Sequence, residues 1–347
     1  MIKQDKGVSM NVIELQGSFG IEQLKHAERE RLTPGPGQVL LKMKAVSLNY
    51  RDLLMVKGHY NPKQPLPLIP CSDGVGEVVE LGERVQRVKV GDRVSPNFAP
   101  TWLNGPPNKE KARATLGGPL DGTLTQYMLV DAESLVKHPK HLSNEECATL
   151  PCAALTAWSA LVTQNKIRAG ESVLVQGTGG VSLFALQFAK IMGARVIVTS
   201  SSNEKLEKAI ELGADEGINY KEQPEWGKIA KKIAGGEGVD HIIEVGGAET
   251  LKQSLRAVKI GGNIMMIGVL SGVQSKVPLT SILMNQIRVQ GILVGHREGF
   301  EAMNRAITHH QLHPVVDRVF SWQDIQEAFR YLESAKHFGK ICVSIDS

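Results

Sequence analysis

The feature that most constrains the fold is a glycine cluster directly after a short apolar run. Residues 172–176 read SVLVQ, and Gly177, Gly179 and Gly180 follow before the helical pattern VSLFALQFAKIMG and a second apolar run, ARVIVTS. Glycines at a strand-to-helix turn let the backbone bend sharply and approach a pyrophosphate, whose charge is stabilised at the helix N-terminus. The pattern therefore predicts a dinucleotide site that includes Val181. The alternative is a tight turn without a ligand.

The end of the second apolar run indicates which dinucleotide is bound. Ser200, Ser201 and Ser202 stand where NAD-binding chains usually place Asp or Glu, and Glu204 and Lys205 follow. Hydroxyl groups and an ammonium can donate to a 2′-phosphate, whereas a carboxylate at the strand end would repel it. We therefore predict NADP, with Ser200, Ser201 and Lys205 at its 2′-phosphate. Alternatively Ser202 only caps the next helix and Lys205 is solvated, and Glu204 keeps NAD open.

Two kinds of pattern divide the chain of 347 residues, which is too long for one ordinary core. Short β segments bounded by glycine and proline occupy about residues 10–135. From about residue 170, runs rich in Val and Ile alternate with helical patterns, which predicts a parallel sheet with helices on both faces. The C-terminal segment from Ser321 ends in another strand, which we expect to rejoin the first domain.

Two pairs of residues mark predicted helix starts. Ser143 and Glu146 have capping-box spacing, and Ser321 and Asp324 have cap spacing before a second helical pattern. Pro151 is expected to interrupt or restart the first of these helices.

The composition argues against several function classes. The formal net charge is +4, and no block of like charges indicates nucleic acid or an anionic membrane as a partner. No apolar run is long enough for a membrane span, and the N-terminus does not resemble a signal peptide. The four cysteines form no CxxC pair, so we expect free thiols in a cytoplasmic protein.

The chain resembles the medium-chain dehydrogenase/reductase superfamily over nearly all its length, in its quinone oxidoreductase-like branch without zinc ligands. The resemblance is carried, in order, by SLNYRDLLMVKGHY, PLIPCSDGVGEVVELGERVQRVKVGDRV, GTLTQYMLV, PCAALTAWSAL, the glycine cluster and AFRYLESAKHFGKICV. It implies an α/β fold: a GroES-like β-barrel catalytic domain at 1–155, completed by 296–347, and a Rossmann doubly wound parallel-sheet domain that binds NADP at 156–295. It also implies a homodimer that pairs through the strand VQGILVG.

The resemblance also bears on zinc. Zinc-dependent members place their three catalytic ligands at the positions that hold Asn49, Ser72 and Cys152 here. Catalytic zinc needs three ligands of Cys, His or carboxylate type, and only Cys152 qualifies. The segment at 98–122 contains no cysteine for a structural zinc. We therefore predict a chain without metal. A rearranged site that uses Cys71 and Asp73, which flank Ser72, is the alternative.

The absence of zinc ligands bears on the reaction. Reducing a simple ketone develops a localised alkoxide, which usually needs a Lewis acid or a strong proton donor. Hydride addition to a conjugated carbonyl spreads the charge. The sequence therefore predicts a zinc-independent oxidoreductase that uses NADPH to reduce a small-molecule quinone or other α,β-unsaturated carbonyl. The alternatives are an NADP-linked alcohol dehydrogenase or ketone reductase, and a nucleotide-binding protein with little turnover.

The resemblance also implies roles for individual residues. Asn49 and Tyr60 are expected near the nicotinamide, with Tyr60 as a candidate proton or hydrogen-bond donor. Tyr50 and Asp52 are further catalytic candidates; their alternatives are a packed aromatic side chain for Tyr50 and an ion pair or turn cap for Asp52. His59 is a further candidate donor, and its alternative is a surface position. The remaining expected cofactor contacts are Thr156, Tyr220, Ile267, Gly268, Ile292 and Val294.

Overall fold

A computed structural model describes residues 9–345, so the sequence-based interpretation of residues 1–8 lies outside the described chain. The chain divides into two compact units. Unit 1 combines the residues up to Cys152 with those from Gly295 onward, and unit 2 is Ala153–Val294. The boundaries expected from the sequence, after residues 155 and 295, lie close to these positions.

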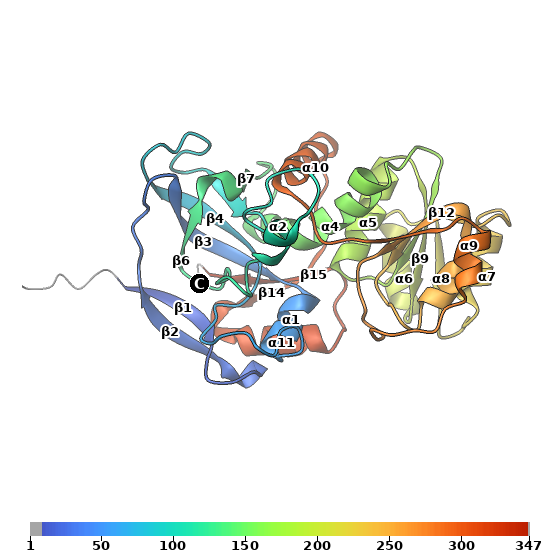
Figure 1. Cartoon of the computed structure of the whole chain (residues 1–347), viewed down its shortest axis with the longest axis horizontal. Coiled ribbons are helices and arrows are strands. Elements are labelled where there is room, and N and C mark those ends of the chain that lie inside the picture. The colour runs from blue at the N-terminus through green and yellow to red at the C-terminus, as the bar shows by residue number, and fades with distance from the viewer. Residues whose placement is uncertain (1–8, 346–347) are drawn as a thin grey trace, which may run out of the picture. The chain divides into compact units, whose positions relative to one another are not determined.

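Unit 1 is built on a seven-stranded sheet and a two-stranded sheet (Figure 1). The order in the larger sheet is β14-β15-β3-β4-β5-β7, and β6 pairs with β3. Its strands are β3 (Gln38–Leu48), β4 (Asp73–Leu81), β5 (Arg93–Pro96), β6 (Tyr127–Asp131), β7 (Leu135–Lys137), β14 (Val316–Ser321) and β15 (Lys340–Ser344); β1 (Ser9–Leu15) pairs with β2 (Leu24–Glu30). Because β15 pairs with β3, the prediction that the C-terminal segment rejoins the first domain is confirmed.

The helices of unit 1 are short apart from two near its C-terminal end. They are α1 (Tyr50–Val56), α2 (Lys109–Arg113), α3 (Asn144–Ala148), α10 (Arg297–His310) and α11 (Ile325–Glu333). The predicted capping box at the start of α3 is confirmed, since Ser143 and Glu146 cap each other's backbone N–H groups. The cap at Ser321 differs from the expectation. Its hydroxyl accepts from the N–H of Gln323 and so caps a short 3-10 turn, and α11 begins only after it.

Unit 2 is a six-stranded sheet in which every pairing is parallel, with the order β10-β9-β8-β11-β12-β13. This is the strand order of a doubly wound Rossmann sheet, as predicted. The strands are β8 (Ser172–Gln176), β9 (Arg195–Ser200), β10 (Glu216–Asn219), β11 (Val239–Glu244), β12 (Val258–Met266) and β13 (Arg288–Gly291). The helices are α4 (Leu155–Trp158), α5 (Gly180–Ile191), α6 (Asn203–Glu211), α7 (Trp226–Ile233), α8 (Leu251–Ala257) and α9 (Leu279–Met284).

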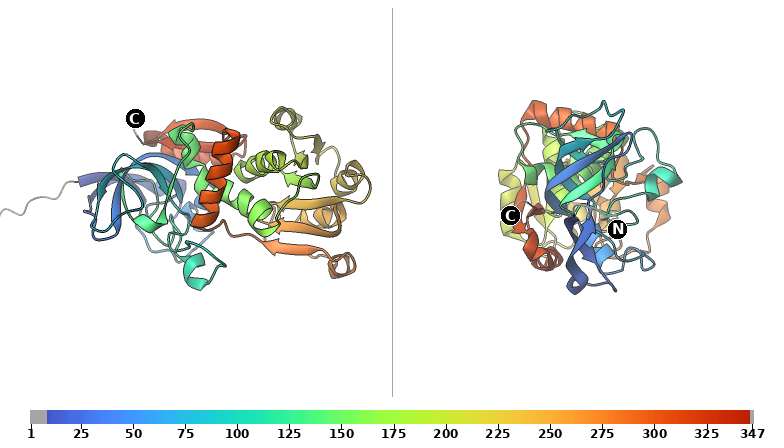
Figure 2. Two further views of the ribbon diagram at one scale, coloured as in Figure 1. Left: turned by 90° about the horizontal axis from the view of Figure 1, so that it is seen from above. Right: turned by 90° about the vertical axis from the view of Figure 1, so that its left-hand side faces the viewer.

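The sheet of unit 2 is buried because its strands carry apolar side chains on both faces. Residues of α7 and α8, among them Trp226 and Leu255, pack with Leu174 and Ile242 of the central strands. On α5, Phe188 packs edge-on against Trp158 of α4. Strand β13 lies at one margin of unit 2 together with α9 (Figure 2, left). It ends at Gly291, earlier than the predicted strand VQGILVG.

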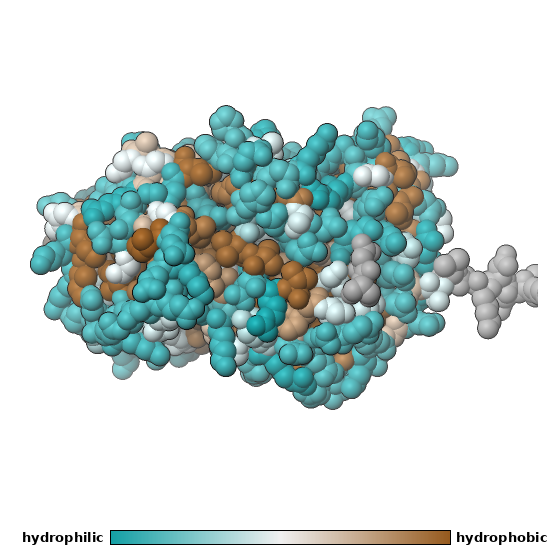
Figure 3. Space-filling model, turned by 180° about the vertical axis from the view of Figure 1, so that it is seen from behind, coloured by the Kyte–Doolittle hydropathy of each residue, from teal (hydrophilic) through white to brown (hydrophobic). Residues whose placement is uncertain are grey.

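No helix within residues 9–345 is both long and apolar enough to cross a membrane. On the face seen in Figure 3, hydrophobic surface forms separate patches among hydrophilic residues. All four cysteines lie within the described residues and are free thiols, as expected.

Candidate functional site

The glycine turn in unit 2 has the geometry expected of a pyrophosphate cradle. Gly177 has φ +73°, a left-handed conformation that suits glycine, and Gly179 is the N-cap of α5. A Cβ placed on Gly179 would meet no atom within 4 Å, so nothing in the fold obstructs the outer side of the turn. Gly180 and Val181 form the first turn of α5. The turn therefore fits a dinucleotide, whose pyrophosphate the N-terminus of α5 would stabilise.

The three serines that the sequence analysis placed at the end of the second apolar run lie at and just after the end of β9. Ser200 is buried at the end of β9, and its hydroxyl accepts from the N–H of Ser202 at 3.3 Å. Ser202 caps α6 by accepting from the N–H of Lys205, so the capping role considered for Ser202 is confirmed. Ser201 and the Lys205 side chain are half-buried. Glu204 is exposed, and its carboxylate accepts from Lys208, which lowers the carboxyl pKa.

Strand β10 brings the expected Tyr220 to this strand end, together with polar groups that the sequence did not indicate. Tyr220 follows β10, is exposed, and donates its backbone N–H to the Ser200 carbonyl at 3.0 Å. Asn219 lies opposite Ser200 in the parallel pairing. Its side chain and that of Asn203 donate to the Glu222 carboxylate at 3.0 and 2.7 Å. These contacts depend on the pairing of the ends of β9 and β10, which the sequence alone does not show.

The other expected cofactor contacts lie in unit 2, and several of their N–H groups are already engaged. Ile267 and Gly268 donate to the Glu244 carbonyl at 2.8 and 3.3 Å, and Ile292 donates to the Met266 carbonyl at 2.9 Å. Val294 has φ +37°, a rare conformation for a β-branched residue.

Thr156, also expected to contact the cofactor, is buried in α4.

Glu244, at the end of β11, is a buried carboxylate that the sequence analysis did not identify. It accepts from the side chains of Gln176, Thr250 and Ser254 at 2.7, 2.6 and 2.5 Å. The N–H groups of residues 246–247 donate to it at 2.9 Å. These bonds satisfy the charge, so Glu244 stabilises the turn that follows β11.

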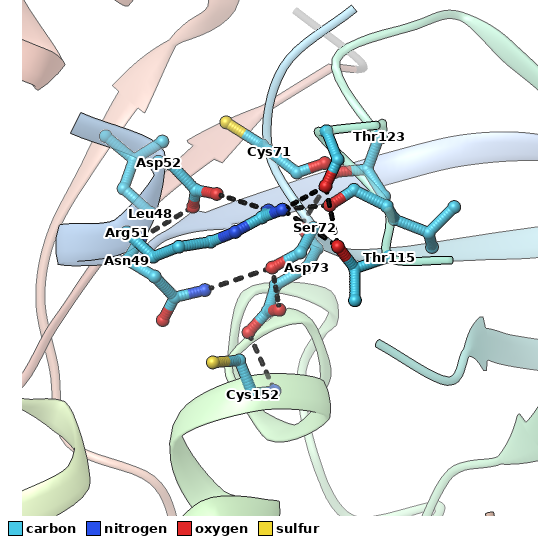
Figure 4. Close-up of polar contacts among 12 residues, drawn as sticks. Leu48, Asn49, Arg51, Asp52, Cys71, Ser72, Asp73, Thr115, Thr123 and Cys152 are labelled. Carbon is cyan, nitrogen blue, oxygen red and sulfur yellow. Dashed lines mark hydrogen bonds and ion pairs between the residues drawn. The ribbon is translucent and has the colours of Figure 1, made fainter. Parts of the chain in front are cut away.

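In unit 1, Asn49 and Asp52 form the N-terminal cap of α1 (Figure 4). The carboxylate of Asp52 accepts from the backbone N–H of Asn49 at 2.9 Å, so the capping role weighed for Asp52 is present. Asp52 is fully buried, which raises the pKa of its carboxyl despite the neighbouring Arg51.

A chain of hydrogen bonds extends from the Asn49 side chain (Figure 4). Asn49 Nδ2 donates to Ser72 Oγ at 3.5 Å, the long end of the range, and Ser72 Oγ donates to Asp73 Oδ1 at 2.7 Å. The N–H of Cys152 donates to Asp73 Oδ2 at 3.0 Å. On the other side, Lys340 Nζ donates to Asn49 Oδ1. We call these four side chains, Lys340, Asn49, Ser72 and Asp73, the polar chain.

The strained backbone at Cys71 helps to position the polar chain. Cys71 has φ +69°, and its carbonyl accepts from the N–H of Thr123 at 2.9 Å. The neighbouring loop approaches so closely that a Cβ on Gly122 would lie 2.0 Å from the Cys71 carbonyl oxygen. This tight contact holds Cys71 in its unusual conformation and so fixes the next residue, Ser72.

Three candidates from the sequence lie at the surface. Tyr50 and Tyr60 are 44% and 51% exposed, and His59 is exposed. The Tyr60 ring packs against the guanidinium of Arg51, which itself donates to the Leu116 carbonyl at 2.6 Å. The structure thus brings Asn49 and Asp52 together and leaves the two tyrosines at the surface.

Burial shifts the pKa values of the acidic groups in this cluster. Burial raises the pKa of Asp73 to about 6, although Lys340 opposes the shift. Burial also raises the pKa of the Cys152 thiol strongly, and Asp73 adds to the effect. Cys152 is therefore a neutral thiol near neutral pH.

The residues at the three family positions do not fit zinc. The Asn49 oxygen already faces the ammonium of Lys340 and Ser72 offers a neutral hydroxyl, so only Cys152 is a ligand of the type that zinc prefers. A zinc ion needs anionic or imidazole ligands, and an adjacent ammonium would repel it. Within the part of the chain that the structure describes, no three His, Cys, Asp or Glu side chains are grouped so that they could hold a metal ion.

Comparisons with known proteins identify the family to which the chain is similar, through matches in both units. The family described as alcohol dehydrogenase GroES-like domain matches residues 35–140, and the family described as zinc-binding dehydrogenase matches residues 180–309. A zinc-type alcohol dehydrogenase-like protein of Schizosaccharomyces pombe is 46% identical over 94% of this chain and 96% of its own length. An acryloyl-coenzyme A reductase of Metallosphaera sedula is 31% identical over 90% of this chain and 93% of its own.

Solved structures of alcohol dehydrogenases have the same fold as this chain. A Sinorhizobium meliloti protein with an alcohol dehydrogenase designation has a TM-score of 0.91 and 42% identity, over 97% of this chain and 99% of its own. An NAD-dependent alcohol dehydrogenase has a TM-score of 0.89 and 33% identity, over 97% of this chain and 100% of its own.

Proposed function

Because the chain belongs to the medium-chain dehydrogenase/reductase superfamily, we propose that it uses NADPH to reduce a quinone or another α,β-unsaturated carbonyl without zinc. The proposal rests mainly on the hydrogen bonds of the Asn49 side chain. Its oxygen accepts from the ammonium of Lys340, and its amide nitrogen donates to Ser72. This arrangement offers hydrogen bonds to a substrate oxygen and no ligand set for a Lewis acid. The reductase of a conjugated thioester among the relatives is consistent with such chemistry.

In this proposal two groups of residues have separate roles. The glycine turn and the N-terminus of α5 in unit 2 would hold the pyrophosphate. When bound, the nicotinamide supplies a hydride. Asn49 in unit 1 donates a hydrogen bond to the carbonyl oxygen, which gains negative charge as the hydride adds. Because conjugation spreads that charge, we propose that a hydrogen-bond donor is sufficient here and that the resulting enolate takes its proton from water.

The preference for NADPH rests on the strand end at β9. Ser200, Ser201 and Lys205 would contact the 2′-phosphate, with Tyr220 beside them. The Glu222 carboxylate accepts hydrogen bonds from two amides, and together with Glu204 it would weaken this preference. We expect tighter binding of NADPH than of NADH.

The variant S201D tests this cofactor preference. A carboxylate at this position should repel the 2′-phosphate and accept from the 2′-hydroxyl, so NADPH affinity should fall about tenfold or more and NADH affinity should rise. Titration of protein fluorescence with each nucleotide measures both. The variant S275D, at an exposed serine of the same unit and outside this strand end, is the control. Wild-type protein that binds NADH more tightly than NADPH would contradict the cofactor proposal.

The reaction itself is tested by following NADPH oxidation with three kinds of acceptor. The panel contains a 1,4-benzoquinone, a 2-alkenal and a saturated ketone, each measured with chelator present. We expect turnover of the first two and little of the third. Ketone reduction that is lost with chelator would favour the alcohol dehydrogenase alternative. Tight NADPH binding without turnover of any acceptor would favour a nucleotide-binding protein.

A further inference from the structure

Lys340 is a buried lysine at the first position of β15. In the pairing of β15 with β3, Ile341 lies opposite Leu48, which brings Lys340 next to Asn49. The Lys340 residue is only 4% exposed, and its ammonium donates to the Leu48 carbonyl at 2.7 Å as well as to Asn49 Oδ1. A buried ammonium is costly, so these bonds and the nearby carboxyl groups of Asp52 and Asp73 must offset its desolvation.

The ammonium determines which way the Asn49 amide points. An ammonium only donates hydrogen bonds, whereas an amide has one accepting oxygen and one donating NH₂ group. The oxygen must therefore face Lys340, and the NH₂ group must point away from it. Without such a partner, the two orientations of an asparagine amide are nearly equivalent in shape.

Ser72 and Asp73 also determine which groups donate and which accept along the polar chain. Ser72 has a single hydroxyl hydrogen, which it donates to Asp73, so its oxygen is free to accept from Asn49. Asn49 Nδ2 has two hydrogens; one is directed to Ser72, and the carboxylate of Asp73 beside Ser72 also interacts with this amide. Of the four members of the polar chain, Asn49 is also the most exposed, at 9%.

We propose that Lys340 is a positioning residue that holds Asn49 as a hydrogen-bond donor to the carbonyl oxygen of the substrate. The inference rests on the proposed function and deepens it. An N–H directed at that oxygen stabilises the negative charge that hydride addition creates. A flipped amide would present its oxygen instead, which repels a developing oxyanion. Lys340 thereby selects the amide orientation that suits reduction of a conjugated carbonyl.

Three variants test the role by kinetics. K340M removes the fixed ammonium and should lower kcat about tenfold while the KM for NADPH is unchanged. N49D keeps an acceptor for Lys340 but cannot donate, and should lower kcat about a hundredfold. K340R keeps a charged group that only donates, and should retain more activity than K340M. K336M, at an exposed lysine in the preceding turn, is the matched control and should behave as wild type.

A double-mutant cycle separates positioning from a general structural role. If Lys340 acts through Asn49, K340M should have little further effect on kcat in an N49A background. Additive losses in kcat would overturn the proposal. If K340M does not fold, the comparison of K340R with N49D, alone and combined, replaces the cycle.

A spectroscopic readout keeps the inference testable without turnover. The side-chain amide signals of Asn49 in a ¹⁵N–¹H spectrum can be assigned by their loss in N49D. We expect one set of signals in the wild type, and shifted or doubled signals in K340M because the amide can flip. Wild-type protein that turns over none of the acceptors would defeat the proposed function, whereas the spectra would still test the orientation. Unchanged Asn49 signals in K340M would overturn the role of Lys340.

Discussion

At the scale of single residues, Asp73 makes the clearest prediction about pH. Burial raises the pKa of its carboxyl from 3.8 to about 6 in the folded protein. Between these values the folded chain binds a proton that the unfolded chain has released, so the free energy of unfolding should fall as the pH rises. The contribution of Asp73 is fully present below pH 4 and lost above pH 6, and it amounts to about 3 kcal/mol.

The variant D73N isolates this contribution from that of other carboxyl groups, including Asp52. Urea unfolding of both proteins should be measured at intervals from pH 4 to 7. The difference in free energy of unfolding between wild type and D73N should change across this window and level off above it. A difference that stays constant from pH 4 to 7 would show that Asp73 titrates normally.

At the scale of the element, Glu244 determines the stability of the turn after β11. Its carboxylate accepts from three side chains and two backbone N–H groups. E244Q replaces one accepting oxygen with an NH₂ group that faces donors. We expect a loss of about 2 to 3 kcal/mol in the free energy of unfolding, measured by urea denaturation.

The control for E244Q is E249Q, at an exposed position in the same turn. It should lie within about 0.5 kcal/mol of the wild type. Equal stability of the two variants would mean that the bonds to Glu244 contribute little beyond those that water provides.

At the scale of the whole molecule, the margin of unit 2 presents a strand edge and exposed apolar side chains. Among the described strands, β13 pairs with β12 alone, and edge strands are available for pairing with another chain. On the neighbouring α9, Leu279, Leu283 and Met284 are 73%, 73% and 75% exposed. Exposed apolar side chains grouped in this way are typical of an interface, so we propose a homodimer formed through β13 and α9.

Light scattering coupled to size-exclusion chromatography measures the association. The wild type should have the mass of two chains, and L283E should shift it toward one chain because a charge would be buried in the interface. I210E, at another exposed apolar position on α6, should leave the mass unchanged. A wild-type mass of one chain would rule out the dimer.

Local patterns predicted much of the fold. The glycine turn, the Ser202 cap and the capping box at Ser143 depend on neighbours a few residues away, and all three are present. Spacing did not reveal that the helix after Ser321 would be delayed by a 3-10 turn.

The candidate site was less predictable, because its contacts join distant parts of the sequence. Lys340 and Asn49 are 291 positions apart and meet only because β15 pairs with β3. The sequence around Glu244 predicts only a buried apolar strand, since nothing nearby shows that five donors converge on its carboxylate. In both cases the missing information was strand pairing.

We propose above all that this chain reduces a conjugated carbonyl without a metal ion. The most direct test is to dialyse the protein against a zinc chelator, measure its metal content by mass spectrometry, and compare its rate of 2-alkenal reduction with NADPH before and after. We expect an unchanged rate in protein with far less than one zinc per chain. A rate that disappears with the chelator and returns with added Zn²⁺ would contradict it.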